Sequence, residues 1–207
     1  MDMLSAQAIQ DAGLADWRKL MLGLHARFLT GSFAEGVRFV SAVGDAASAV
    51  PEIKLGDGFV DLRLGAADEG DLDLARTISS IAQSLGLKAD PSAVAHLELG
   101  LDTADRDAIG PFWAAVLTGD PAAYEDIEVV DSTGRVVTIW FQKTEPHEPP
   151  RQRFHLDLWL APEAVPGRIE AALAAGGTVA SDDEAPAFTV LADPQGNKVC
   201  LCTYLDR

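Results

Sequence analysis

The stretch His96-Leu97-Glu98-Leu99-Gly100-Leu101 returns 59 positions later as His155-Leu156-Asp157-Leu158-Trp159-Leu160. Successive side chains of a strand point to opposite faces, so in each copy the histidine and the acid share one face and the leucines share the other. Each copy precedes a helical run and then two strand-like runs about a turn, DSTG in the first copy and DPQG in the second. The repeat predicts two βαββ units. Because neither unit can bury its sheet face alone, we expect the two to pack as one domain.

The sequence before this repeat predicts alternating helices and antiparallel strands. Ser32 and Glu35 have capping-box spacing ahead of apolar residues at helical intervals, and Pro51 follows that run. The runs EIKL and FVDLRL flank a GDG turn and predict a hairpin. The segment DLDLARTISSIAQSLG has an apolar helical face and ends at Gly86. The expected fold class is α+β, with an α/β sandwich in the first half.

The segment GLKADPSAV, residues 86–94, separates the two halves. It contains a glycine that can end a helix, followed by a polar run with a proline. We therefore predict one domain over residues 1–88 and a second over residues 94–207.

Composition argues against partners that carry negative charge. The chain of 207 residues holds 32 acidic and 16 basic residues, a formal net charge of −16, so we expect no nucleic-acid partner and no membrane partner. The N-terminal run MDMLSAQAIQDAGL lacks the apolar core of a signal peptide, and no window approaches 18 uncharged apolar residues. Cys200 and Cys202 are two apart in a strand-like run, too far apart for a disulfide, which predicts a cytoplasmic location.

The second half resembles the vicinal oxygen chelate superfamily, which includes glyoxalases, bleomycin-resistance proteins and extradiol dioxygenases, and it is most similar to the glyoxalase-like type. The resemblance rests on the paired units, the FWAAVLTG helix, the RFHLDLWL strand and the ADPQGN turn. It implies two βαββ modules that form a cupped sheet around a central site, where a divalent metal polarises substrate oxygens.

The metal ligands that the resemblance implies are only partly present. His96 and His155 match the first-strand ligand positions, and both suit zinc, nickel or iron. The family's last-strand glutamate is replaced by Cys200 in the second module, and the first module offers only Gln142. A catalytic zinc needs about three protein ligands, so His96, His155 and Cys200 are the candidate set. The alternative is a metal-free cleft lined by the two histidines.

Acidic and aromatic residues complete the predicted site. Glu98 and Asp157 share the histidine face and are candidate catalytic bases, or else hydrogen-bond partners within the cleft. Aromatic walls suit a flat, partly polar small molecule. The candidate ligand-binding residues are Trp113, Trp140, Gln142 and Trp159, and the alternative for each tryptophan is core packing.

The first half resembles pterin-4a-carbinolamine dehydratases through ADW, RFLTGSFAEGVRFVSAVGDAA, PEI and DLDLARTISSIAQ. The family's His-His-Pro run is replaced by Ala49-Val50-Pro51, and a further histidine is missing from the shortened GAADEG segment. Alanine and valine cannot transfer a proton, so we do not expect dehydratase activity. The domain is interpreted as a degenerate relative that is kept for ligand binding, dimerisation or stability.

These observations predict a small-molecule-binding glyoxalase-like protein, with lyase or isomerase activity at a cleft between the two modules. The alternatives are a non-catalytic protein that sequesters its ligand, as resistance-type relatives do, and a residual 4a-hydroxytetrahydrobiopterin dehydratase. The expected partners are a small-molecule ligand and a second copy of the chain in a homodimer.

Overall fold

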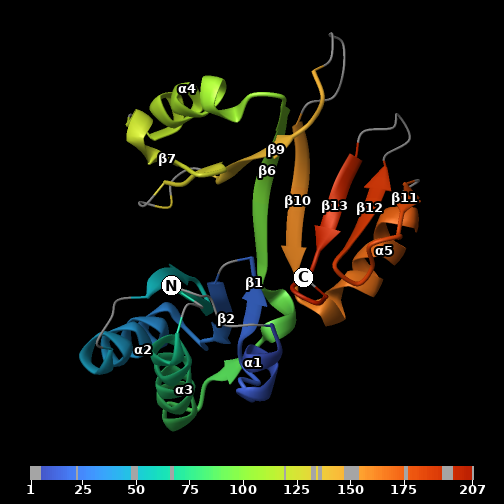
Figure 1. Ribbon diagram of the computed structural model, residues 1–207. Coiled ribbons are helices and arrows are strands. Elements are labelled where there is room, and N and C mark those ends of the chain that lie inside the picture. The colour runs from blue at the N-terminus through green and yellow to red at the C-terminus, as the bar shows by residue number, and fades with distance from the viewer. Residues whose placement is uncertain are drawn as a thin grey trace. The chain divides into compact units, whose positions relative to one another are not determined.

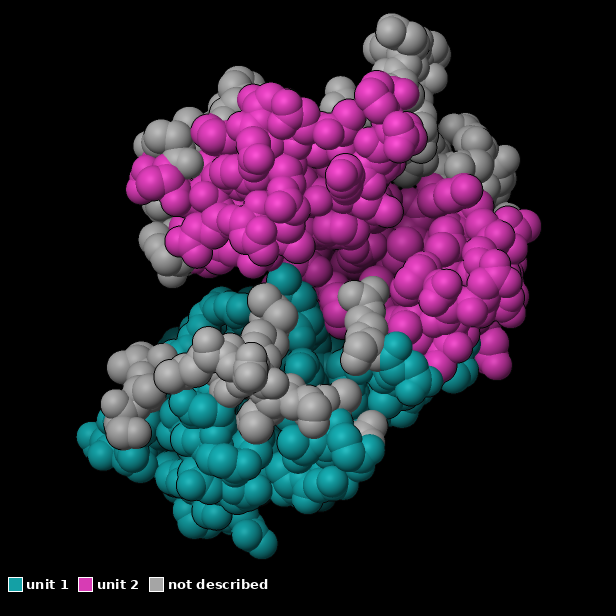
Figure 2. Space-filling model, viewed as in Figure 1, with its two compact units in different colours: residues 1–95, 160–166, 203–207 teal, residues 96–159, 167–202 magenta. Residues whose placement is uncertain are grey.

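The computed structural model describes residues 6–21, 23–47, 51–65, 68–118, 120–131, 134, 137–146, 154–174, 177–192 and 198–206. Two compact units are present (Figure 2): unit 1 comprises residues 1–95, 160–166 and 203–207, and unit 2 comprises residues 96–159 and 167–202. Two short, late segments therefore belong with the N-terminal residues. The domain limits 1–88 and 94–207 stay a prediction.

Unit 1 is a mixed helix and sheet unit. Its sheet has the order β1-β2-β4-β3, all antiparallel, and β5 also pairs with β2. The predicted EIKL and FVDLRL hairpin is confirmed by the pairing of β3 with β4. The elements are α1 (Ala6–Asp11), β1 (Arg18–Leu20), β2 (Gly23–Leu29), α2 (Phe33–Ala46), β3 (Glu52–Gly56), β4 (Phe59–Gly65), α3 (Glu69–Ser84), β5 (Lys88–Ala89), η1 (Pro91–Ala93) and η3 (Pro162–Ala164).

The two long helices of unit 1 start at polar caps. The Ser32 side chain accepts a hydrogen bond from the backbone N–H of Glu35, which confirms Ser32 as the N-cap of α2. Helix α3 begins at a capping box of Asp68 and Asp71, a few residues earlier than the sequence predicted. At 16 residues α3 is the longest described helix, and none of the described helices is long and apolar enough to cross a bilayer.

Unit 2 contains an eight-stranded sheet with the order β11-β12-β13-β10-β6-β9-β8-β7 (Figure 1). In each half the first strand runs parallel to the last, and the remaining neighbours are antiparallel. The elements are β6 (Ala95–Thr103), α4 (Arg106–Thr118), η2 (Pro121–Ala123), β7 (Tyr124–Glu125), β8 (Glu128–Val129), β9 (Ile139–Lys143), β10 (Phe154–Leu160), α5 (Val165–Ala174), β11 (Thr178–Ser181), β12 (Phe188–Ala192) and β13 (Lys198–Cys202).

The duplication is confirmed, but the repeated unit needs a correction. Three strands follow the helix in each copy instead of the two that the sequence predicted, because β7 and β11 add one edge strand to each module. β7 has only two residues, and β11 is mostly exposed, so neither strand carries the apolar alternation of a half-buried strand. The DPQG turn and part of the DSTG turn lie outside the described residues.

The two faces of the first module differ sharply. Helix α4 packs on β7, β8 and β9 (Figure 1), and the core beneath it contains Leu101, Ile139 and Phe141. The pairing of β6 with β9 places Gly100 beside Trp140 and Asp102 beside Gln142. These positions alternate along the two strands with those of the core residues. Because side chains alternate along a strand, these residues lie on the opposite face.

Candidate functional site around His155

His155 on β10 lies between two carboxylates. Its Nδ1 is 3.6 Å from Oδ1 of Asp102 on β6, and its Nε2 is 3.7 Å from Oδ2 of Asp157 on β10. All three side chains are largely buried, with exposed fractions of 18% for His155, 15% for Asp102 and 10% for Asp157. Both ring nitrogens therefore face an acidic group, which is an environment that favours the imidazolium form.

The electrostatics follow from this geometry. The interaction with the Asp157 carboxylate is the main cause that raises the pKa of His155 above its ordinary value of 6.5, and Asp102 adds to it. Burial acts in the opposite direction, because desolvation disfavours the charged ring. The attraction of the carboxylates outweighs burial, so His155 holds its proton more tightly than an exposed histidine does.

The contacts between β6 and β10 also determine how the two copies meet. On β6, Glu98 comes before Asp102, and on β10, His155 comes before Trp159. Glu98 contacts Trp159 and Asp102 contacts His155, so the order of the contacts is reversed between the two strands. The neighbouring strands β6 and β10 are therefore antiparallel at the centre of the sheet. This arrangement gives the eight strands an approximate twofold symmetry, with each module presenting its first strand to the other.

Gly100 makes room for the His155 ring. A Cβ atom added at Gly100 would overlap with Nε2 of His155, well inside van der Waals contact. The equivalent position in the second copy of the repeat is Trp159, whose side chain is 6% exposed. The two copies therefore differ at the residue that decides whether a histidine can lie over the centre of the sheet.

Each repeated acid accepts a hydrogen bond from an indole. Nε1 of Trp159 donates to Oε2 of Glu98 at 2.7 Å, and Nε1 of Trp140 donates to Oδ2 of Asp157 at 2.9 Å. Glu98 and Asp157 are both buried, so these bonds compensate part of the desolvation of their carboxylates. The Trp140 ring also meets the His155 ring edge to face, with centroids 5.2 Å apart.

The structure brings most of the predicted site residues together on one face. Trp140, His155 and Asp157 are in direct contact, Glu98 and Trp159 form the adjacent pair, and strand register places Gln142 beside Asp102 and Cys200 beside Asp157. The residues of this face, called the polar face below, are Glu98, Gly100, Asp102, Trp140, Gln142, His155, Asp157, Trp159 and Cys200.

Two predicted residues do not join this group. His155 lies beside Asp102, which is six residues from His96 along β6, so roughly 20 Å separates His96 from His155 at the rise of a strand. The expectation that both imidazoles face one hollow is wrong, because the antiparallel pairing of the two copies carries them to opposite ends. Trp113 lies on α4 and packs edge to face against Phe154, with ring centroids 5.7 Å apart, as part of the apolar core beneath that helix.

The side chains present do not fit the predicted metal site. His96, His155 and Cys200 cannot meet at one ion, given the separation of the two histidines. Among the described residues, no three His, Cys, Asp or Glu side chains are grouped so as to hold a metal ion. A metal ligand also needs a neutral imidazole with an available lone pair, whereas both nitrogens of His155 face carboxylates. Cys200 and Cys202 form no disulfide, as expected from their spacing.

Sequence reasoning missed Asp102 and Gly100. Asp102 continues the alternation of His96, Glu98 and Gly100, so its face was readable from the sequence. Its partner was not, because only the antiparallel pairing of β6 with β10 brings Asp102 to His155. The dehydratase positions Ala49 and Val50 lie outside the described residues.

Two equivalent modules that share one sheet, with polar residues on the face away from α4, define a protein of the vicinal oxygen chelate class. A family model described as a glyoxalase-like domain matches residues 98–202, just over half of the chain. The chain belongs to this glyoxalase-like domain family.

Other comparisons give little more. No curated protein matches the chain. Among solved structures, a transcriptional coactivator/pterin dehydratase from Brucella melitensis is similar at 22% sequence identity and a TM-score of 0.37, over 39% of this chain and 99% of that chain. At this level of similarity, the dehydratase-like arrangement of the first half stays a prediction.

Proposed function

We propose that the protein binds a small organic molecule on the polar face and converts it as a lyase or isomerase by proton transfer through His155. The observation that carries the proposal is the imidazole of His155 held between Asp102 and Asp157 on the face away from α4. A histidine whose ring is positioned by carboxylates is a common general acid or base.

The roles follow from the contacts of each group. The raised pKa means that His155 holds its ring proton more tightly than an ordinary histidine does, so we assign it to donate a proton from a ring nitrogen to an oxygen of the ligand. Asp157 is oriented by the indole N–H of Trp140, which suits it to hold the ring of His155 in place. Asp102 faces the other nitrogen and is the carboxylate that we assign to accept a proton from carbon.

A second candidate function is ligand sequestration without turnover. It is favoured by the two indole–carboxylate bonds, which engage Glu98 and Asp157, the acids that the sequence nominated as bases. Acids that are buried and hydrogen-bonded in this way support the architecture of a binding face as readily as they support catalysis. The two functions share the site and differ in whether a proton leaves the ligand.

Hydrogen–deuterium exchange at carbon distinguishes these functions. Small α-hydroxy ketones and 2-oxo acids are incubated with the protein in D₂O, and loss of the proton signal next to the carbonyl is followed by NMR, with binding measured in parallel. A lyase or isomerase catalyses exchange, and His155→Gln lowers the exchange rate by about a hundredfold or more. His96→Gln is the matched control, because the same residue type lies roughly 20 Å away and should leave exchange unchanged.

The remaining outcomes are equally informative. Binding that depends on His155 without exchange would favour sequestration. Exchange that survives His155→Gln, or binding that is indifferent to this substitution, would contradict the proposed site.

A further inference from the structure

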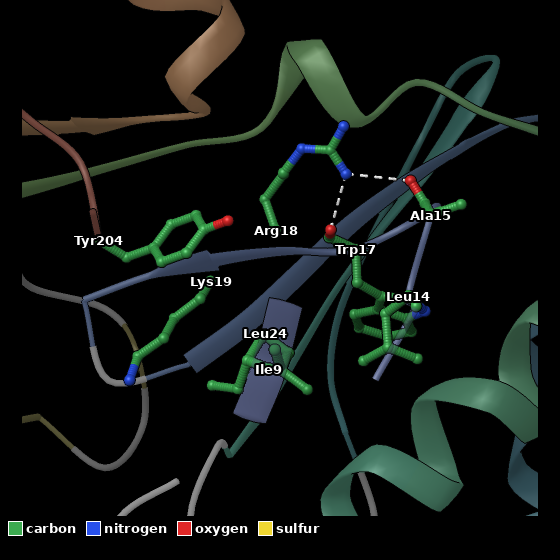
Figure 3. Close-up of a pocket in the computed structure, with 9 residues that line it drawn as sticks. Ile9, Leu14, Ala15, Trp17, Arg18, Lys19, Leu24 and Tyr204 are labelled. Carbon is green, nitrogen blue, oxygen red and sulfur yellow. Dashed lines mark hydrogen bonds between the residues drawn. The ribbon is translucent and has the colours of Figure 1, made fainter. Parts of the chain in front are cut away.

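The sheet of unit 1 has two outer strands, β1 and β3, which differ in what lies beside them. β1 has three residues, and late segments of the chain approach it. The Arg18 guanidinium contacts the Glu163 carboxylate, and it also donates to the carbonyl oxygens of Ala15 and Trp17 (Figure 3). β3 has five residues, and among the described residues it pairs with β4 alone. β3 is therefore the outer strand that another chain can extend.

The backbone of β3 presents hydrogen-bonding groups to the outside of the sheet. The hairpin of β3 and β4 closes at Gly56 opposite Phe59, with two residues between them. A two-residue hairpin closes on a hydrogen-bonded pair, so Gly56 and every second residue before it bond to β4. The N–H and C=O groups of Ile53 and Leu55 therefore point away from β4. The register of β3 is continuous, whereas the outer strand β11 of unit 2 has a register shift.

The charges of β3 are complementary to a second copy of the same strand. Glu52 and Lys54 are two positions apart and share one face. When two copies pair antiparallel with Ile53 opposite Ile53, Glu52 of each copy lies opposite Lys54 of the other. Opposite charges at facing positions stabilise an antiparallel pair. A register with Lys54 opposite Lys54 brings like charges together, so the charges favour the Ile53 register.

Both charged side chains are placed to make this contact. Lys54 is exposed and forms no ion pair with the described residues, and its neighbour Asp61 on β4 is bound by two guanidinium N–H groups of Arg27. Glu52 contacts Arg63 through one carboxylate oxygen at 3.1 Å, and its side chain is 60% exposed. The Glu52 carboxylate can therefore accept a second cation from beyond the edge of the sheet.

Helix α2 presents apolar side chains toward the same edge. Phe39 packs on a phenylalanine of β2, with ring centroids 5.2 Å apart, whereas a Cβ atom added at Gly36 would first meet the Leu55 side chain of β3. The direction from Phe39 to Gly36 around the helix thus leads from the middle of the sheet to the β3 edge. Phe33 and Val37 lie further round in that direction and are 54% and 43% exposed.

We propose that β3 is a homodimer interface, in which two copies of the chain pair antiparallel with Ile53 opposite Ile53 and join their unit 1 sheets. Phe33 and Val37 of each α2 then approach the same residues of the other copy, which removes apolar surface from water. A twofold interface needs a self-complementary patch, and β3 provides one in backbone, charge and apolar surface. All of these residues belong to unit 1, so the proposal is independent of the function proposed for the polar face.

Charge reversal in the full chain tests the interface, with sedimentation velocity over a range of concentrations as the measurement. We expect a reversible dimer for the parent protein. Lys54→Glu places acid opposite acid, and Glu52→Lys places lysine opposite lysine, so each variant should raise the dissociation constant by at least about tenfold. A mixture of the two variants restores both opposite-charge contacts and should form heterodimers nearly as tightly as the parent. This rescue is specific to the Ile53 register.

Matched controls separate the interface from general effects. Lys88→Glu makes the same charge change at an exposed lysine of β5 and should leave the dimer unchanged. Val37→Gln should weaken the dimer by about tenfold, whereas Val179→Gln, at a valine of unit 2 with nearly the same exposure, should not. Hydrogen exchange followed by NMR should slow at the amides of Ile53 and Leu55 as the protein concentration rises.

Several outcomes would overturn the proposal. One is a chain that stays monomeric up to about 1 mM. Others are a dimer that keeps its dissociation constant in Lys54→Glu and Glu52→Lys, or two weakened variants whose mixture does not associate. Exchange that slows only at another outer strand, such as β11, would place the interface there. Glu52 and Lys54 are exposed, so both variants should fold, which circular dichroism checks.

Discussion

At the scale of single residues, the fifth position of the repeated motif decides what each copy does. Gly100 leaves space that the His155 ring fills, whereas Trp159 fills the equivalent space itself and donates to Glu98. The two copies of the strand each carry a histidine and an acid at equivalent positions, but the side chains around these residues differ. The space at Gly100 is filled by the one imidazole that lies between Asp102 and Asp157, that of His155.

Gly100→Ala tests this role of the glycine. The new Cβ must displace the His155 ring, so we expect a loss of about 1–3 kcal/mol in the free energy of unfolding and a His155 pKa that moves back toward its ordinary value. Denaturant unfolding and NMR titration of the ring measure the two effects. Gly44→Ala is the control, because its Cβ would meet nothing within 4 Å on the exposed side of α2, and alanine should stabilise that helix by about 0.5–1 kcal/mol. Unchanged stability and pKa in Gly100→Ala would show that the ring does not depend on this space.

The raised pKa of His155 predicts a stability that depends on pH. The folded protein binds the proton more tightly than the unfolded chain, so this contribution is complete below about pH 6.5 and is lost as the pH rises through the folded pKa. The free energy of unfolding, measured between about pH 6 and pH 9, should fall more in the parent protein than in His155→Gln. If the free energy of unfolding had the same pH dependence in both proteins, Asp102 and Asp157 would not stabilise the protonated ring of His155.

At the scale of elements, the sequence predicted those whose signals are local. Helices α2 and α3 and the hairpin of β3 and β4 are confirmed, because caps, apolar faces and a glycine turn act over a few neighbouring residues. β7 and β11 were missed because these short edge strands owe their existence to pairing with β8 and β12. The pairing of β6 with β10 is likewise a property of two strands that are distant in the sequence.

A double-mutant cycle measures the link between those two central strands. Trp159→Phe removes the N–H that Glu98 accepts in a buried environment, and we expect a loss of about 1–3 kcal/mol in stability. Glu98→Gln removes the charge that needs this donor. The double variant should therefore lose less free energy of unfolding than the two single variants lose in sum. Trp140→Phe with Asp157→Asn provides the comparison, since it tests the equivalent pair in the other copy. Strict additivity in thermal and denaturant unfolding would count against an energetic link at Glu98.

At the scale of the whole molecule, the units do not follow the chain in order. Residues 160–166 and 203–207 belong to unit 1, although they flank segments of unit 2. The Arg18 guanidinium contacts Glu163, and this contact lowers the pKa of the Glu163 carboxyl. The chain therefore returns to its N-terminal unit twice.

A fragment of residues 1–95 tests this organisation. It lacks Glu163 and Tyr204, so we expect it to unfold at a lower temperature than unit 1 does within the full chain, as followed by calorimetry. Glu163→Gln in the full chain is the control for the ion pair alone. It should cost no more than about 1 kcal/mol, because Glu163 is 42% exposed and solvent screens the pair. A fragment as stable as unit 1 in the full chain would show that the late segments add nothing.

The sequence alone determined the duplication, the α+β class, the shared face of histidine and acid in each copy, and the resemblance to glyoxalase-like proteins. These properties depend on spacing along the chain, which a linear pattern records. The tertiary structure alone decided that His155 lies with Asp102 and apart from His96, and that residues 160–166 and 203–207 belong to the N-terminal unit. Strand direction and the return of distant segments are set by long-range packing, and no local pattern specifies them.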